Sequence, residues 1–180
     1  MKEALELATQ QQQPAAEAPR PATRDPEVHL AAFRVGQDEM VIDIMRIREI
    51  LRPVPVTPLP KAPLGVKGMI NLRGSVIPII DVRTRFGLPT VEGMRTQRVM
   101  VVLDRRRLWG LHVDAVMEVV RVPRSIIRPG TEIFTGDAAE VFSGVLEHKG
   151  RLLLMLNLAR FIQRDESVPI PALLPPGGRP

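Results

Sequence analysis

Few residues in this 180-residue chain have the types and spacing that catalysis or metal binding requires. The three histidines, His29, His112 and His148, lie far apart without metal-ligand spacing, and cysteine is absent. Ser143 has neither a GxSxG turn around it nor a base nearby in the sequence. No glycine-rich phosphate-binding motif occurs. The sequence therefore predicts a protein that is not an enzyme and that uses no metal and no cofactor.

Binding chemistry is better supported, and it centres on one arginine. Arg73 lies in the tetrad NLRG at 71–74, between two apolar runs. Asparagine suits the first position of a type I turn, and Gly74 suits the αL position that completes a turn-plus-bulge hairpin. The guanidinium would then lie at a tight tip, where its fork of donors suits a carboxylate. A solvated surface charge is the other interpretation of Arg73.

Short strands and tight turns around this tip predict a mainly β protein. Strand candidates lie at 29–35, 39–43, 98–103, 108–114, 141–147 and 151–157. The segment 44–51, behind Asp43 as a cap, is either a short helix or a turn that runs on as a strand. Five prolines make 53–63 an extended connector. Pro78 requires the second strand of the NLRG hairpin to be an edge or to carry a bulge.

The hairpin near the C-terminus repeats the NLRG hairpin at constant spacing. Three pairs of residues lie 76 positions apart: Gly68 and Gly144, Gly74 and Gly150, and Asp81 and Asn157. Upstream, the tripeptide at 41–43 is echoed at 112–114, an offset of 71. Shared spacing indicates an internal duplication. It predicts two small β-barrels of about five strands each, packed on each other with a groove between them.

Composition limits the remaining function classes. Aromatic residues make up only 3% of the chain, so the core must be aliphatic, and the formal charge is +5. The charge permits nucleic-acid binding, but single-strand binders need aromatic stacking platforms. No apolar run reaches the length of a membrane span, and the N-terminus is not a secretory signal, which predicts a cytoplasmic protein. Residues 1–27 are predicted to be a disordered extension, and 167–180 a flexible proline-rich tail.

The segment VKGMINLRGSVIPIIDVRTRFGL at 66–88 strongly resembles the bacterial chemotaxis coupling proteins of the CheW family. The resemblance extends over about 30–162. It implies two SH3-like five-stranded barrels with short helices around a shared core, in one domain at 28–166. The subdomains are expected at about 36–96 and 97–157, with flanking segments completing the barrels.

Family resemblance also implies function and partners. It implies a non-catalytic adaptor that couples chemoreceptor tips to the regulatory domain of the histidine kinase CheA and that can contact other CheW copies. It implies neither nucleic-acid binding nor membrane insertion, with recruitment to receptor arrays at the inner membrane. Two alternatives stay open: a basic small-barrel nucleic-acid binder, and a CheW-like paralogue in a non-flagellar chemosensory pathway.

The partner-binding residues follow by motif. Arg73 matches the arginine of NLRG, which the family uses in partner binding, and Glu49 matches an acidic residue expected to pair with it. The expected surface also includes Ile47, Gly68, Asn71 and Gly74. An exposed pair of this kind contributes only about 0 to 1 kcal/mol of stability, so its value would lie in orienting the guanidinium. A receptor helix is expected to lie in the groove between the barrels.

Overall fold

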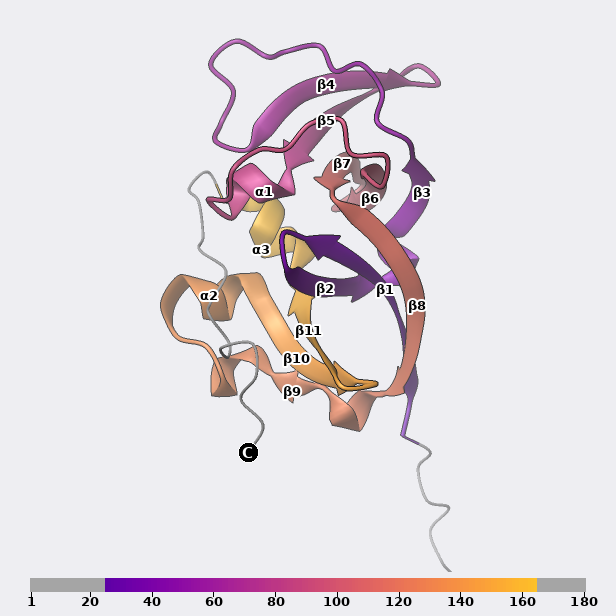
Figure 1. The fold of residues 1–180 in the computed structure, drawn as a ribbon, viewed down its shortest axis with the longest axis vertical. Helices are drawn as coiled ribbons and strands as arrows, with labels where there is room; N and C mark the ends of the chain where they lie inside the picture. The colour runs from indigo at the N-terminus through magenta and orange to yellow at the C-terminus, as the bar shows by residue number, and fades with distance from the viewer. Residues whose placement is uncertain (1–24, 165–180) are drawn as a thin grey trace, which may run out of the picture.

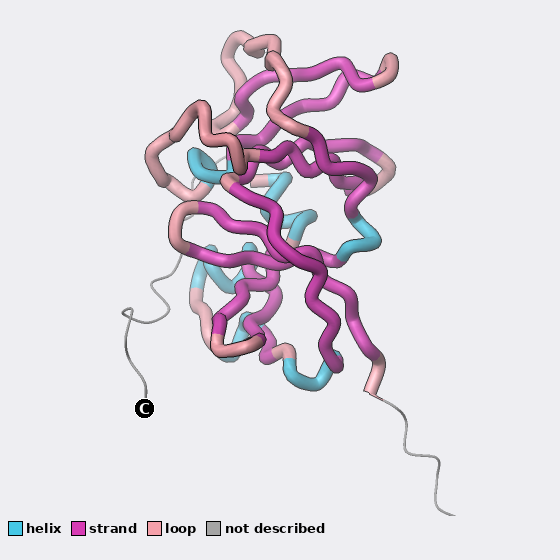
Figure 2. The backbone as a smooth tube through the Cα atoms, turned by 45° about the vertical axis from the view of Figure 1, so that its right-hand side comes forward, coloured by secondary structure: helices cyan, strands magenta, loops and turns pink. Residues whose placement is uncertain are grey.

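The computed structural model describes residues 25–164. Residues 1–24 of the predicted extension at 1–27, and the predicted tail at 167–180, therefore lie outside the described residues. Residues 25–27 are described, and the expectation that they are disordered is wrong, because Glu27 begins the first strand and the carbonyl of Pro26 accepts a hydrogen bond from the N–H of Arg124. The described chain forms two mixed sheets, and Figures 1 and 2 show one sheet above the other. The predicted fold class is confirmed: the protein is mainly β, with short helices around a core that both sheets share.

One sheet has six strands and the other has five. The six-stranded sheet has the order β8 (Ala115–Pro123), β1 (Glu27–Val35), β2 (Asp38–Asp43), β11 (Arg151–Leu156), β10 (Phe142–His148) and β9 (Arg128–Pro129). The five-stranded sheet has the order β3 (Ile47–Leu51), β6 (Arg98–Asp104), β7 (Arg107–Val113), β5 (Ser75–Asp81) and β4 (Val66–Leu72). The helices are α1 (Val82–Arg85), α2 (Gly136–Val141) and α3 (Leu158–Gln163), with 3-10 turns η1 (Ile44–Arg46), η2 (Arg124–Ile126) and η3 (Gly130–Glu132).

The sheets do not divide the chain into consecutive halves. The five-stranded sheet uses 47–113, whereas the six-stranded sheet combines 27–43 with 115–156. The expected boundary between 96 and 97 is therefore not where the sheets separate, because β6 and β7 pair with the strands before them. Parallel pairs, β5 with β7 and β2 with β11, complete each sheet. The six-stranded sheet exceeds the expected five strands because the two-residue β9 adds to β10.

The largest buried cluster lies between the sheets. Phe33 and Met40 from the six-stranded sheet pack in the same cluster as Met100 and Leu111 from the five-stranded sheet. All five phenylalanines of the chain are buried. The ring of Phe86, just after α1, stacks on Phe142 of β10 and makes a tilted contact with Phe161 of α3. Fully burying each such side chain stabilises the fold by about 1.5–3 kcal/mol. The shared core therefore ties the two subdomains into one folded unit.

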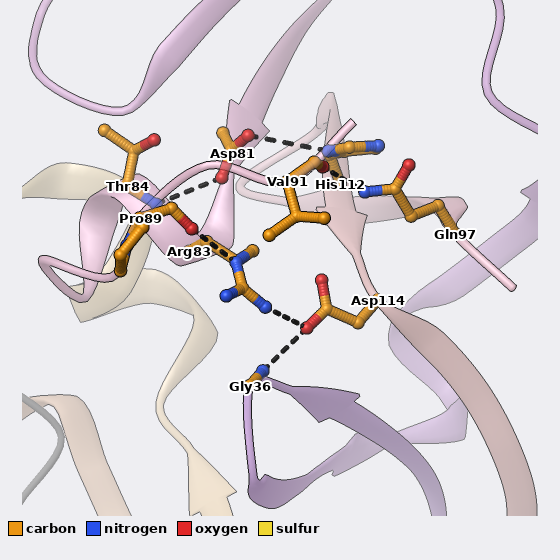
Figure 3. Close-up of polar contacts among 9 residues, drawn as sticks. All are labelled: Gly36, Asp81, Arg83, Thr84, Pro89, Val91, Gln97, His112 and Asp114. Carbon is orange, nitrogen blue, oxygen red and sulfur yellow. Dashed lines mark hydrogen bonds and ion pairs between the residues drawn. The ribbon is translucent and has the colours of Figure 1, made fainter. Parts of the chain in front are cut away.

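A buried polar link also joins the two sheets (Figure 3). The guanidinium Nη1 of Arg83, on α1, lies 2.5 Å from Oδ2 of Asp114, just after β7. The same oxygen accepts a 2.7 Å hydrogen bond from the backbone N–H of Gly36, in the β1–β2 turn. The side chains of Arg83 and Asp114 are only 15% and 6% exposed. This arrangement fixes α1, which follows β5 of the five-stranded sheet, against the β1–β2 turn of the six-stranded sheet.

The duplication is visible in the backbone. Each repeated hairpin has a register shift at its start, at Val66/Gly68 and at Phe142/Gly144, which keeps the offset of 76 residues. Asp81 caps α1 and Asn157 caps α3, at the same offset. The upstream offset of 71 is wrong. The turns at 36–37 and 105–106 occupy the same place in the β1–β2 and β6–β7 hairpins, and they give an offset of 69.

Candidate partner-binding surface

The NLRG turn is tighter than the predicted turn-plus-bulge hairpin. Leu72 pairs directly with Ser75, which leaves a two-residue turn. Arg73 and Gly74 both have positive φ, +51° and +86°, as in a type I′ turn, so the predicted type I turn with a bulge is wrong. The αL conformation of Gly74 is confirmed. The side chain of Asn71 accepts a 2.9 Å hydrogen bond from the N–H of Gly74 and so supports this uncommon backbone.

The predicted pair of Glu49 and Arg73 forms. Nη2 of Arg73 lies 3.1 Å from Oε2 of Glu49. The Arg73 side chain is 80% exposed and the Glu49 side chain 25% exposed. This single contact orients the guanidinium and leaves its other donors toward solvent. Because the pair is so exposed, it adds at most about 1 kcal/mol to stability.

The same pair shows how the five-stranded sheet closes into a barrel. Glu49 lies on β3 and Arg73 joins β4 to β5, although β3 and β4 are the opposite edges of this sheet. The proline-rich connector between these edges also joins β4, because Thr57 forms an antiparallel bridge with Met69. The sheet must therefore curve until its edges approach each other, as in a small barrel.

Gly68 belongs to the packing of this barrel and not to its surface. It is buried, and its φ is +144°. A Cβ at this position would lie 2.1 Å from the carbonyl oxygen of Thr57. The glycine therefore lets the connector cross β4. Its predicted place near a partner surface is not supported by its burial, whereas Asn71, Arg73 and Gly74 are exposed.

Ile47 lines a groove between the two barrels. The groove has a volume of about 400 Å³ and lies between β3 and β8, which are edge strands of the two sheets. Its lining is Ala31, Ile44, Ile47, Arg48, Glu49, Ile50, Val116, Met117, Glu118 and Val119. Three of these apolar side chains are exposed: Ile50, Met117 and Val119. The groove was expected from the repeat, but these three residues were not. Met117 and Val119 lie two positions apart on β8, and this spacing could have placed them on one face of the strand.

The second repeat carries a related ion-pair cluster that sequence reasoning missed. Lys149, at the β10–β11 turn, lies 3.5 Å from Glu118 on β8, and Arg151 contacts the same carboxylate. Hydrogen bonding from Arg151, followed by the charge of Lys149, lowers the pKa of the Glu118 carboxyl. Glu118 follows Glu49 by 69 residues and Lys149 follows Arg73 by 76. The corrected upstream offset would have identified this pair.

The barrel tip and the groove have the features of surfaces that bind other proteins. Within residues 25–164, no group of three histidines or acidic residues is placed to hold a metal ion. The helices within the same range are all much shorter than a membrane-spanning segment. An oriented cation at a barrel tip and an apolar groove between barrels are the features of a scaffold protein that holds other proteins together.

Comparison with known proteins identifies the family. A family model described as the CheW-like domain matches residues 29–166, and the chain therefore belongs to the CheW family of chemotaxis adaptors. It is 37% identical to chemotaxis protein CheW of Rhizobium meliloti (strain 1021), over 76% of this chain and 88% of that protein. It is 31% identical to chemotaxis protein CheW of Helicobacter pylori, over 74% of this chain and 80% of the relative.

A solved structure agrees with this assignment. The scaffolding protein TtCheW from Thermoanaerobacter tengcongensis superposes with a TM-score of 0.71 at 27% identity, covering 77% of this chain and 94% of that chain. The comparisons favour neither of the alternative functions. The burial of all five phenylalanines also removes them as stacking platforms for a nucleic acid.

Proposed function

We propose that this chain couples the cytoplasmic tips of chemoreceptors to the regulatory domain of the histidine kinase CheA, in receptor arrays at the inner membrane. The observation that carries the proposal is the exposed Arg73 guanidinium, held at the barrel tip by Glu49. A fork of free donors in a fixed direction suits a carboxylate or a row of carbonyl groups on a partner. The NLRG tip is therefore the proposed kinase contact.

The groove between the barrels is the proposed receptor contact. An amphipathic helix would place one apolar stripe against Ile50, Met117 and Val119, which are exposed in this structure. Ile47 and Glu49 lie along the same groove. The two proposed contacts meet at β3, because Glu49 both lines the groove and holds Arg73. One β-strand thus links the two partner surfaces.

Co-sedimentation with a receptor signalling fragment and CheA tests both contacts. Arg73→Glu should weaken binding to the CheA regulatory domain by roughly tenfold or more, since it replaces an attraction with a repulsion. Ile50→Asp should instead weaken receptor binding, because it introduces a charge into an apolar contact. Each variant should keep the parent's circular dichroism, because both side chains are exposed.

Arg95→Glu is the charge-matched control for the tip. Arg95 is exposed and precedes β6, so it lies at the end of the five-stranded sheet away from the β6–β7 turn. It should bind both partners as the parent does. If Arg73→Glu bound the kinase domain as tightly as Arg95→Glu, the proposed kinase contact would be wrong. If Ile50→Asp kept full receptor binding, the groove would not be the receptor site.

A further inference from the structure

A cleft opens in the five-stranded barrel where two parallel strands diverge. The ladder between β5 and β7 begins at Ile79 and Gly110, so the earlier residues of both strands do not pair with each other. Pro78 has no N–H to donate toward β7, which accounts for the ladder starting one residue later. The resulting β5–β7 cleft has a volume of about 470 Å³ and is lined by Ser75, Val76, Pro78, Arg106, Arg107, Leu108 and Trp109.

The corresponding place in the six-stranded sheet is filled. There the parallel ladder of β11 and β2 begins at Leu154 and Met40. Ahead of it, Arg151 of β11 reaches Glu39 of β2 at 3.2 Å and also contacts Glu118 of β8. Carboxylates of the chain itself thus hold a cation across that opening. The β5–β7 cleft has two arginines in its lining and no acidic residue.

The side chains of the cleft are available to a partner. Arg106 and Arg107 are exposed, and within residues 25–164 neither side chain forms an ion pair or a hydrogen bond. Val76 is 63% exposed, and Trp109 is half-buried. A free phosphate would use the cations but not this apolar lining. Strand edges, apolar side chains and unpaired cations together fit an extended chain that carries both aliphatic and acidic residues.

We propose that the β5–β7 cleft binds an extended acidic peptide segment of a partner protein. The segment would pair with the free strand edges and place its carboxylates against Arg106 and Arg107. Because β5 and β7 run parallel, the cleft opens at the same end of the barrel as Arg73. The inference rests on the proposed function, because it describes the chemistry of a segment of a partner protein that binds at the barrel end carrying Arg73.

Trp109 makes the test direct, because it is the only tryptophan of the chain and it lines the cleft. The full chain is titrated with a synthetic peptide of alternating glutamate and valine while tryptophan fluorescence is followed. We expect a saturable change that weakens with added salt, and no saturable change with a lysine–valine peptide. Arg106→Glu combined with Arg107→Glu should raise the Kd of the acidic peptide by roughly tenfold.

Arg121→Glu combined with Arg124→Glu is the matched control, because both arginines are exposed, Arg121 on β8 of the six-stranded sheet and Arg124 in η2 directly after it. This control should keep the parent's Kd. Val76→Asp, which adds a carboxylate to the cleft, should weaken the acidic peptide without any change at an arginine. The proposal is wrong if the acidic peptide gives no saturable signal, or if the lysine peptide, inorganic polyphosphate or the Arg106/Arg107 variant binds equally well.

The same variants separate this proposal from the proposed function. If the acidic peptide does not bind while Arg73→Glu still weakens the kinase contact, the cleft proposal is overturned and the proposed function stands. If the peptide binds as expected while Arg73→Glu leaves the kinase contact unchanged, the cleft proposal is supported and the proposed kinase site is wrong.

Discussion

Single polar residues in this protein act mainly by fixing the direction of other groups. Glu49 directs Arg73 at the tip, and Asn71 supports the turn beneath it. Inside the fold, Asp81 caps α1, because its Oδ1 accepts a 3.0 Å hydrogen bond from the backbone N–H of Thr84. The other oxygen of Asp81 lies 3.6 Å from Nδ1 of His112 (Figure 3). These residues contribute through geometry more than through the energy of one contact.

The Asp81 carboxyl makes the free energy of unfolding depend on pH in the acid range. Burial raises its pKa, but the interactions with His112 and with the N–H of Thr84 outweigh burial and lower the pKa below its usual value. A depressed pKa in the folded state gives stability that is present above the unfolded pKa of about 3.9. That stability is lost as the pH falls through the folded value. Asp81→Asn should therefore flatten the loss of stability below about pH 4.

Urea unfolding at several pH values measures this effect. Asparagine can still cap α1, so the cap itself is retained. Asp43→Asn is the control, because Asp43 is an exposed cap that accepts a 2.8 Å hydrogen bond from Met45. An acid dependence in Asp81→Asn as steep as in the control would show that another carboxyl is responsible.

At the scale of elements, the sequence predicts the hairpins better than it predicts their pairing. The NLRG tetrad locates a turn, but residue preferences favour a type I turn because arginine rarely adopts a positive φ. The left-handed backbone conformation of Arg73 is stabilised by two neighbouring contacts. The side chain of Asn71 accepts a hydrogen bond from the N–H of Gly74, and Leu72 pairs with Ser75 across the turn. The parallel pairs β5–β7 and β2–β11 join distant segments, and no local pattern encodes them.

In the candidate site, too, contacts between matched residues could be predicted from the sequence, but surfaces formed by distant strands could not. The Glu49–Arg73 pair followed from the family resemblance, which matches the two residues in separate segments, and the structure confirms the contact. Gly68 followed from the same resemblance, yet its burial depends on a connector whose path the sequence does not give. The β5–β7 cleft depends on where a parallel ladder begins, so it could not be inferred from spacing. Local chemistry is thus readable from the sequence, whereas surfaces between distant strands are not.

Gly68 provides the element-scale prediction. Gly68→Ala should lower the free energy of unfolding by more than about 2 kcal/mol, because its Cβ would lie 2.1 Å from the carbonyl oxygen of Thr57. Gly74→Ala is the matched control, since Gly74 also has positive φ but has nothing within 4 Å of the added Cβ. It should cost only about 1–2 kcal/mol, for the left-handed backbone alone. Equal losses in urea unfolding would show that the connector does not constrain Gly68.

At the scale of the molecule, two barrels behave as one body because their sheets interleave in sequence and share a core. The chain passes from the six-stranded sheet into the five-stranded sheet after β2 and returns before β8. The largest buried cluster draws on both sheets. The proposed contacts at the groove and at the barrel tip depend on this shared core, because it keeps the two surfaces in a fixed relative position.

A substitution in the buried link between Arg83, Asp114 and Gly36 tests whether the two barrels unfold as one unit. Asp114→Ala leaves a largely buried guanidinium without its carboxylate and removes the acceptor of the Gly36 N–H. Loss of one partner from a buried pair costs about 3–5 kcal/mol, so we expect a decrease of about 3 kcal/mol in the free energy of unfolding. Asp137→Ala removes an exposed partner of Arg164 and should cost less than about 1 kcal/mol.

Because the core is shared, Asp114→Ala should lower the stability of both barrels together. Trp109 fluorescence reports the five-stranded sheet, and far-UV circular dichroism reports both sheets. The two signals should give coincident urea transitions in the parent and in Asp114→Ala, with both midpoints shifted equally. If the Trp109 and dichroism transitions coincided in the parent but separated in Asp114→Ala, the barrels of the variant would unfold independently. In that case the buried link, and not the shared core, would be what joins them.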